Sequence, residues 1–225
     1  ILKKYGADIL RIWVAASDYA EDLRIDNSIL EQHAESYRKI RKTFRYILGN
    51  LNDKFEKVNF EKLDINNLPE LEQFMLCKIF KMNLMFEKNF KIYNFHALYK
   101  ELLNFCTVDL SAFYFDIRKD SLYCDKIDSP KRKSTIIFLN ILLEILLKWF
   151  APILSFTTEE IYSLLKINSN KSIHLENFPK IPSKWNDQDL EAKPNANIVN
   201  IGSKPGKNTP RTQSVAVTDL ASVSP

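Results

Sequence analysis

The sequence predicts an all-α protein, a helical bundle, on the basis of three observations. Only four of the 225 residues are glycine, and two of these, Gly202 and Gly206, fall near the end of the chain. Helix-start signatures recur along the sequence, and the apolar residues between them follow three- and four-residue steps. With 45% hydrophobic residues the chain can bury a core, which excludes disorder throughout. So few glycines also exclude a phosphate-cradling loop and a dinucleotide fingerprint.

The segment from Tyr5 to Val14 predicts a short first helix. Asp8 lies near its beginning, where a negative charge complements the helix dipole. The polar stretch 18–27 is expected to be a loop. The inward face of this helix is predicted to comprise Ile9, Leu10 and Trp13.

A long second helix is predicted to begin at Ser28, because Ser28 and Glu31 have the spacing of a capping box. Gly49 and Asn50 are expected to end it, since these residue types often terminate helices. Its apolar face comprises Leu30, Ala34, Tyr37, Ile40, Phe44, Ile47 and Leu51.

Residues 52–68 are mixed and polar, and a third helix is expected to open at Pro69. Glu70 and Glu72 would complement the dipole in its first turn. Asn94 is expected to cap a fourth helix. The inward positions of the third helix are Leu71, Phe74, Met75, Ile79, Met82 and Phe86, and those of the fourth are Leu98, Leu102, Phe105, Cys106, Asp109 and Phe113.

The pair Ser129 and Pro130, a cap followed by proline, predicts the start of a fifth helix, which Pro152 is expected to end. Most of this helix is apolar and is predicted to be buried. Polar residues recur every four positions along it, which predicts one narrow wet stripe: Asn140, Glu144 and Lys148.

A second capping box, Thr157 with Glu160, predicts a short sixth helix that reaches Leu165. Residues 172–179 alternate in polarity and are expected to be extended. Residues 186–225 contain no Phe, Trp or Tyr. The segment 194–225 is therefore expected to be a flexible tail, since it cannot bury enough apolar surface to offset its ordering entropy.

Several kinds of site are not expected. The three cysteines are far apart without a C-x-x-C pair, and the three histidines lack metal-ligand spacing, so we expect neither a disulfide framework nor a metal site. We assign no catalytic residue, because no nucleophile–base constellation stands out. The longest apolar run, 136–147, is shorter than the roughly 20 residues that span a bilayer. With no signal peptide the cytoplasm is the default, and a start at Ile1 suggests that an upstream part is missing.

The charge pattern of the second helix is more informative. Two interpretations remain open for it: a solvated face, which usually mixes signs, or contact with the phosphates of RNA or another polyanion. Arginine suits phosphate better than lysine because its fork is planar. Apart from Lys39, the cations fall opposite the Tyr37/Ile40/Phe44 face. Five cations without an acid among them lie within eight residues: Arg38, Lys39, Arg41, Lys42 and Arg45.

Two further basic clusters follow. Lys131, Arg132 and Lys133 come directly after the predicted start of the fifth helix, where cations oppose the dipole, so they either serve a ligand or form a flexible surface turn. Arg118 and Lys119 form a weaker third cluster. The residues alone therefore predict a helical bundle with basic stripes that binds nucleic acid.

The order of several segments resembles that of class I isoleucyl-tRNA synthetases, in the region after their KMSKS signature. The resemblance runs in order from about Ile1 to Lys193. Tyr114–Asp116 with Lys119 and Asp120 separate isoleucyl from valyl and leucyl relatives. The segments that carry it are KYGADILRIWVAASDY (4–19), DLRI (22–25), SYRKIRKTFRY (36–46), FC (105–106), LSAFYFDIRKD (110–120) and WFAPILSFT (149–157).

This resemblance implies a stem-contact segment at 1–27, which braces the catalytic core, followed by a helical anticodon-binding domain at 28–193. The domain would dock the anticodon stem and loop of tRNA(Ile). Trp185 and Asn186 lie near where the family's recognition elements continue. The candidates for tRNA backbone contact are Arg38, Arg41, Lys42, Arg45, Arg118, Lys119, Lys131, Arg132 and Lys133.

The departures from the family pattern are equally informative. The HIGH and KMSKS motifs and any editing domain are absent, so the chain is not expected to be active alone, and ATP would bind the missing catalytic domain. Zinc would belong to the missing C-terminal region, since the sequence after Lys193 matches nothing known in the family. The alternative is a non-catalytic helical RNA-binding or interaction module, left from a split or frameshifted synthetase gene. An in-frame KMSKS-coding stretch directly upstream would favour the ligase.

Overall fold

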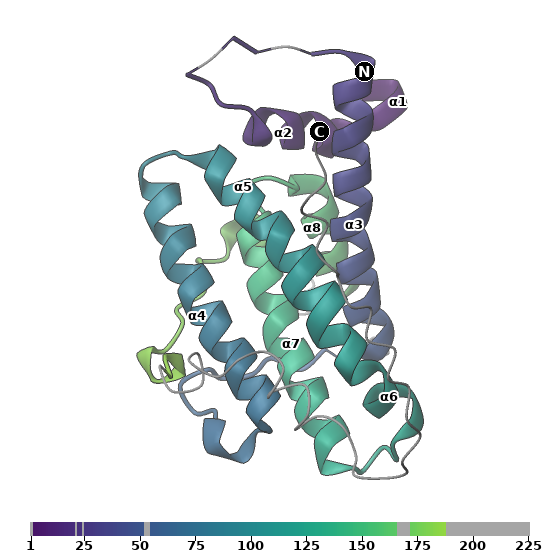
Figure 1. The fold of residues 1–225 in the computed structure, drawn as a ribbon, viewed down its shortest axis with the longest axis vertical. Coiled ribbons are helices and arrows are strands. Elements are labelled where there is room, and N and C mark those ends of the chain that lie inside the picture. The colour runs from purple at the N-terminus through teal and green to yellow at the C-terminus, as the bar shows by residue number, and fades with distance from the viewer. Residues whose placement is uncertain (1, 21, 24, 52–54, 166–171, 188–225) are drawn as a thin grey trace, which may run out of the picture.

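The computed structural model describes residues 2–20, 22–23, 25–51, 55–165 and 172–187. Over these residues the chain forms helices and no strand, which confirms the all-α prediction. In Figure 1 the long helices α3 (Asn27–Leu51) and α4 (Glu70–Lys91) flank the centre of the molecule, and α2 (Ala7–Ala16) crosses one end. The central helix is α7 (Pro130–Phe150), of whose 21 residues twelve are buried.

The first segment forms α1 (Leu2–Tyr5) and α2, joined at Gly6. The φ angle of Gly6 is 84°, in the left-handed region that favours glycine. Asp8 lies in the first turn of α2, but its carboxylate is buried and accepts hydrogen bonds from another helix, as described below. The inward residues are Ile9 and Ile12. The expected face with Leu10 and Trp13 is therefore rotated by part of a turn.

Helix α3 begins one residue before the predicted start, and a different residue caps it. Asp26 Oδ1 accepts hydrogen bonds from the backbone N of Ile29 and from Ser28 Oγ. The predicted Ser28–Glu31 capping box is therefore wrong, because the preceding aspartate takes the cap position. Gly49 does not end the helix either, since α3 continues to Leu51. The apolar face agrees with the prediction, except that Tyr37 is only half-buried.

Helix α4 begins directly after Pro69, one residue later than expected. Glu72 lies in the first turn of α4, as predicted, but it is fully buried and also binds Arg118, as described below. Asn94 caps α5 (Phe95–Asn104) as predicted, with its side chain accepting from the backbone N of Ala97.

The fourth predicted helix continues without a break through α5, a π-helical stretch η2 (Phe105–Phe115) and α6 (Asp116–Cys124). Its core face departs from the prediction inside η2. Leu110 and Tyr114 are buried where Asp109 and Phe113 were expected to face the core. The physical reason is the wider turn of a π-helix, whose i→i+5 bonds shift the inward positions along the chain.

Helix α7 has proline at its first position after Ser129, as predicted, and ends at Phe150, just before Pro152. Its polar row is not a wet stripe. Asn140 is buried and accepts from the backbone N of Glu56, and Lys148 Nζ lies 2.8 Å from Glu144 Oε1. Asn140 thus has an internal partner and Lys148 pairs with Glu144, whereas Glu144 Oε2 is buried without a hydrogen-bond partner among the described residues.

Helix α8 (Ser155–Leu164) begins two residues before Thr157, so the predicted Thr157–Glu160 capping box is also wrong. Residues 172–179 do not form the expected extended segment throughout, because a 3₁₀ turn, η3 (Ile173–Leu175), interrupts them. Two further 3₁₀ turns are η1 (Ile65–Asn67) and η4 (Ser183–Trp185). The predicted tail lies outside the described residues.

The core explains how the three cysteines should react. Burial raises the pKa of the Cys106 thiol to about 12, Cys77 is also buried, and Cys124 is exposed. Since the thiolate is the reactive form, we expect the folded chain to react with a thiol reagent only at Cys124. Ellman titration of native protein should give one fast thiol and denatured protein three. Two fast thiols in the native state would contradict the packing of α4 against α5 and η2.

Candidate nucleic-acid interface

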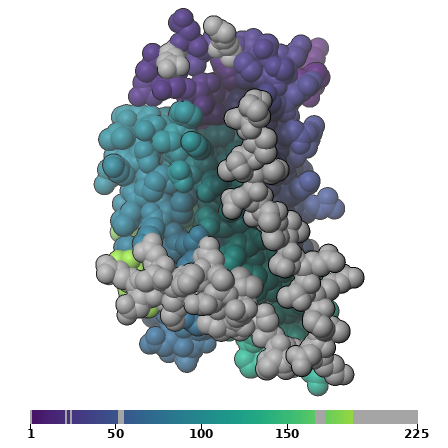
Figure 2. Space-filling view, in the orientation of Figure 1, coloured from purple at the N-terminus to yellow at the C-terminus, as the bar shows by residue number. Residues whose placement is uncertain are grey.

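The candidate site is the solvent face of α3. All five cations of this face are exposed, while Ile40, Phe44 and Ile47 on the other side are almost fully buried. Figure 2 shows the surface of α3 along the right-hand edge of the molecule. The structure therefore places on one accessible helix face the residues that the charge pattern singled out: Arg38, Lys39, Arg41, Lys42 and Arg45.

A chain of hydrogen bonds holds this face against two other helices. Arg41 Nη1 donates to Tyr37 Oη over 3.1 Å, and Tyr37 Oη lies 2.9 Å from Thr157 Oγ1 on α8. Thr157 Oγ1 donates in turn to Asp8 Oδ2 on α2, over 2.6 Å. This series of hydrogen bonds therefore links α3, α8 and α2 through the side chains of Tyr37, Thr157 and Asp8.

The cations differ in how they are engaged. Arg38 forms an exposed ion pair with Glu35, one turn earlier on α3. Within the part of the chain that the structure describes, neither Lys42 nor Arg45 has a hydrogen bond or ion pair with a protein group. Exposed pairs are worth little in water, so all these charges remain available to a polyanion.

Two hollows border the C-terminal half of the basic face of α3. One, of about 480 Å³, lies between α3 and α8 and includes Arg41, Arg45 and Thr157. The other, of about 370 Å³, lies between α3 and α6 and includes Lys42, Arg45 and Tyr123. Arg45 therefore stands between two concave surfaces.

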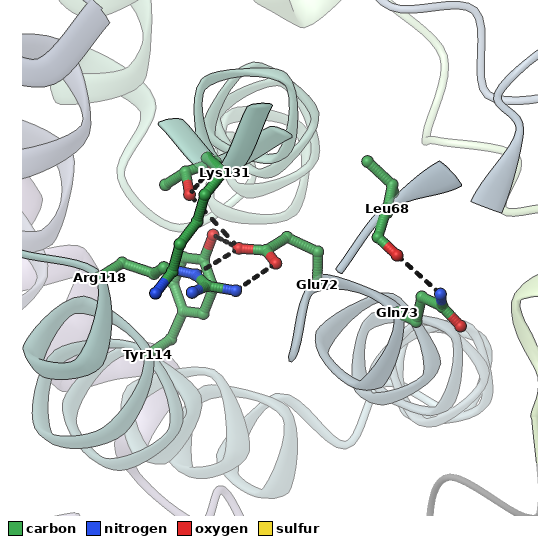
Figure 3. A network of polar contacts seen from close by, with 7 residues as sticks. Leu68, Glu72, Gln73, Tyr114, Arg118 and Lys131 are labelled. Carbon is green, nitrogen blue, oxygen red and sulfur yellow. Dashed lines mark hydrogen bonds and ion pairs between the residues drawn. The ribbon is translucent and has the colours of Figure 1, made fainter. Parts of the chain in front are cut away.

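The cations at the start of α7 are partly engaged in structure. Arg132 Nη1 donates to the backbone oxygen of Asp125 over 2.8 Å, and Lys133 Nζ lies 3.1 Å from Asp128. Lys131 is half-buried beside the network of Figure 3. All three residues lie in the first turn of α7 and not in a flexible surface turn, and only Lys133 is well exposed.

Arg118 does not lie on the surface, and its selection as a phosphate contact is corrected. Its guanidinium is buried and binds both carboxylate oxygens of Glu72, at 2.7 and 2.5 Å. Figure 3 shows this pair with Tyr114, whose hydroxyl donates to the same carboxylate over 2.9 Å. Burial, then the charge of Glu72, raises the pKa of Tyr114 well above its usual range. The network holds α4, η2 and α6 together and cannot reach a ligand outside.

Lys119, next along the chain, is exposed and pairs with Asp116 on α6. One turn further, Tyr123 is a large exposed side chain that sequence reasoning missed. The four-residue spacing from Lys119 to Tyr123 was the available signal, because it places a cation and an aromatic ring on one side of α6.

Trp185 is also unsuited to the recognition role considered for it. It is buried, with its ring 5.4 Å from that of Phe60, whereas Asn186 beside it is exposed. Among the described residues, no three His, Cys, Asp or Glu side chains gather as they would around a metal ion. The same part of the chain contains no helix with the length and apolarity needed to cross a membrane.

The fold is a helical bundle with a basic face on one long helix, and comparison with known proteins identifies its class. The family model of the anticodon-binding domain of tRNA ligase matches residues 72–208, so the chain belongs to this family. The relatives that it matches include several isoleucine–tRNA ligases. The one from Pelagibacter ubique is 68% identical over 193 residues, which are 86% of this chain and 21% of the relative.

More distant relatives give the same result. The isoleucine–tRNA ligase of Brachyspira hyodysenteriae is 41% identical over 85% of this chain and 20% of its own length. That of Persephonella marina is 46% identical, again over 85% of this chain and 20% of its own length. The chain therefore spans about a fifth of the length of the curated relatives it matches.

Proposed function

We propose that this chain is the part of an isoleucine–tRNA ligase that binds the anticodon stem and loop of tRNA(Ile). The family of the chain and the names of its relatives support this function. The main supporting observation is the exposed face of α3. Between residues 38 and 45 this face presents five cations and no acid, and the opposite face of the helix is buried in the core. Such a face complements the regularly spaced phosphates of an RNA stem.

The roles of the individual residues follow from their chemistry. Arg38, Arg41 and Arg45 offer planar forks that can bind phosphate oxygens in pairs, and Lys42 adds a point charge. Lys119 and Lys133 are exposed and extend the positive potential toward α6 and the start of α7. These contacts position the RNA, while base contacts provide specificity.

The other steps of aminoacylation belong, in this proposal, to the remaining parts of the ligase. ATP and isoleucine would bind a catalytic domain, and a zinc ion would belong to a further segment. The segment formed by α1 and α2 would meet that catalytic domain. Its exposed Leu2 and Val14 supply apolar surface for such a contact. The ligase would act in the cytoplasm.

The test is the triple variant Arg38→Ala/Arg41→Ala/Arg45→Ala. We expect weaker binding of tRNA(Ile), and a slope of log K against log salt that is shallower by about 0.7 to 0.9 for each phosphate that the variant no longer neutralises. Filter binding at several salt concentrations measures both quantities, and circular dichroism confirms the fold. Discrimination among tRNAs should change less than total affinity, because backbone contacts carry little sequence information.

A matched control removes the same charge elsewhere. Lys88 and Lys91 on α4 and Lys100 on α5 are equally exposed but lie away from α3. Their triple alanine variant should keep most of the affinity and the salt slope. If both triple variants behave alike, or if the α3 variant binds as well as the wild type, the basic face serves only as a solvated surface.

A further inference from the structure

The hollow between α3 and α6 combines an aromatic ring with two cations. Tyr123 is 66% exposed and lines it from α6. Lys42 and Arg45 line it from α3, and both are exposed. Its volume is about 370 Å³, room enough for one planar ring system beside the tyrosine. An exposed aromatic residue on a flat surface needs no explanation, but one that forms the wall of a cationic hollow does.

The floor of this hollow is rigid. Tyr46 stacks on Phe115 with ring centroids 4.2 Å apart and an interplanar angle of 23°. The side-chain amide of Asn50 donates to the backbone oxygen of Tyr46 over 2.8 Å, which leaves Asn50 Oδ1 to accept a further hydrogen bond. The hollow is thus preformed, and its lining places the amide oxygen of Asn50 alongside two tyrosines, Tyr46 and Tyr123.

Gly49 provides a second, independent observation. It lies within α3, so its backbone does not require glycine, and glycine here costs about 1 kcal/mol of helix stability relative to alanine. A Cβ atom placed on Gly49 would meet nothing within 4 Å. The absent side chain therefore serves neither the helix nor the packing of the core. It keeps open the space on both sides of Arg45, because Gly49 lines both hollows.

We propose that the α3–α6 hollow binds one unpaired nucleotide of RNA, with its base stacked on Tyr123 and its phosphates on Lys42 and Arg45. This inference rests on the proposed function and adds the subsite that the RNA loop would use. An unpaired base exposes the aromatic face and the edge atoms that Tyr123 and Asn50 Oδ1 can engage, whereas a paired base does not. Lys42 and Arg45 are positively charged and therefore attract the phosphates on either side of that base.

The test uses the full chain and a hairpin with the anticodon stem and loop of tRNA(Ile), in which each loop nucleotide in turn is made abasic. With the wild-type chain, one loop position should cost about 5- to 150-fold in affinity, the range of base–aromatic stacking. Tyr123→Ala should weaken binding of the intact hairpin by a similar factor. It should cause no further weakening with the hairpin that is abasic at that position.

Three variants separate stacking from other effects. Tyr123→Phe keeps the ring and should retain most of the affinity. Tyr19→Ala removes a similarly exposed tyrosine from the segment after α2 and should bind like the wild type. Helices α2 and α6 lie at opposite ends of the molecule (Figure 1). Gly49→Gln should fill the hollow, so affinity should fall at least as much as in Tyr123→Ala, while the melting temperature stays equal or rises because a helix former replaces glycine.

The outcomes distinguish this inference from the function on which it rests. If the wild-type chain binds no hairpin, both the proposed function and the subsite are wrong. If it binds, and Tyr123→Ala keeps its affinity or adds its effect to that of every abasic position, the subsite alone is wrong. Unchanged binding by Gly49→Gln would overturn it in the same way.

Discussion

Replacing Arg118 with alanine is expected to lower the free energy of unfolding by about 3 to 5 kcal/mol, because it leaves the carboxylate of Glu72 buried without its counter-charge. Glu72 and Arg118 are both essentially inaccessible to solvent. Tyr114 and Thr135 donate to the same carboxylate, but neither supplies a positive charge. For a chain of this size the melting temperature should fall by roughly 6 to 20 °C. Urea titration and thermal unfolding, both followed by far-UV circular dichroism, measure the change.

Two controls establish that the effect comes from an unpaired buried charge. Lys119→Ala breaks the neighbouring exposed pair with Asp116 and should leave the free energy of unfolding close to that of the wild type. The double variant Glu72→Leu/Arg118→Met removes both charges and should be more stable than Arg118→Ala, since no carboxylate is left unpaired. An Arg118→Ala protein within about 1 kcal/mol of the wild type would show that the pair contributes little to holding α4 against α6.

The parts of the fold that the sequence predicts correctly depend on local chemistry. Asn94 caps α5 and Pro130 opens α7 because both act on backbone groups within one turn of themselves. Some of the incorrect predictions have a long-range cause. The capping box at Thr157 fails because α8 begins at Ser155 and because a carboxylate 149 residues earlier in the chain accepts from the backbone N of Thr157. No window of sequence around α8 contains that information.

The candidate site shows the same division. The α3 cations were predicted from a helical period that the fold preserves, and their exposure is confirmed. Arg118 and Lys119 are adjacent and have the same charge, yet one is buried and the other exposed. Their difference depends on the partner Glu72, 46 residues away, and on the π-helical register of η2, which single-sequence periodicity does not predict. Tyr123 was missed because its neighbours in the hollow come from another helix.

Asp8 is the long-range cap of α8, and its carboxylate accepts three hydrogen bonds. The backbone N of Phe156 lies 3.2 Å from Asp8 Oδ1, and the backbone N and Oγ1 of Thr157 lie 2.8 and 2.6 Å from Oδ2. The positive end of the α8 dipole favours the negative charge at this place. The same interaction fastens α2, and with it the first segment of the chain, to the bundle.

Asp8→Ala is therefore expected to lower the free energy of unfolding by about 2 to 4 kcal/mol. Loss of a cap costs up to about 2 kcal/mol, and the buried donors left without an acceptor add to this. The matched control is Asp26→Ala, which removes an exposed cap from α3 and should lower the free energy of unfolding less than Asp8→Ala does. Asp8→Asn keeps one acceptor oxygen and should fall between the two. Hydrogen exchange at the amides of Phe156 and Thr157 should accelerate in Asp8→Ala and stay unchanged in Asp26→Ala. If both alanine variants lose equal stability and neither exposes those amides, Asp8 does not join α2 to α8 in solution.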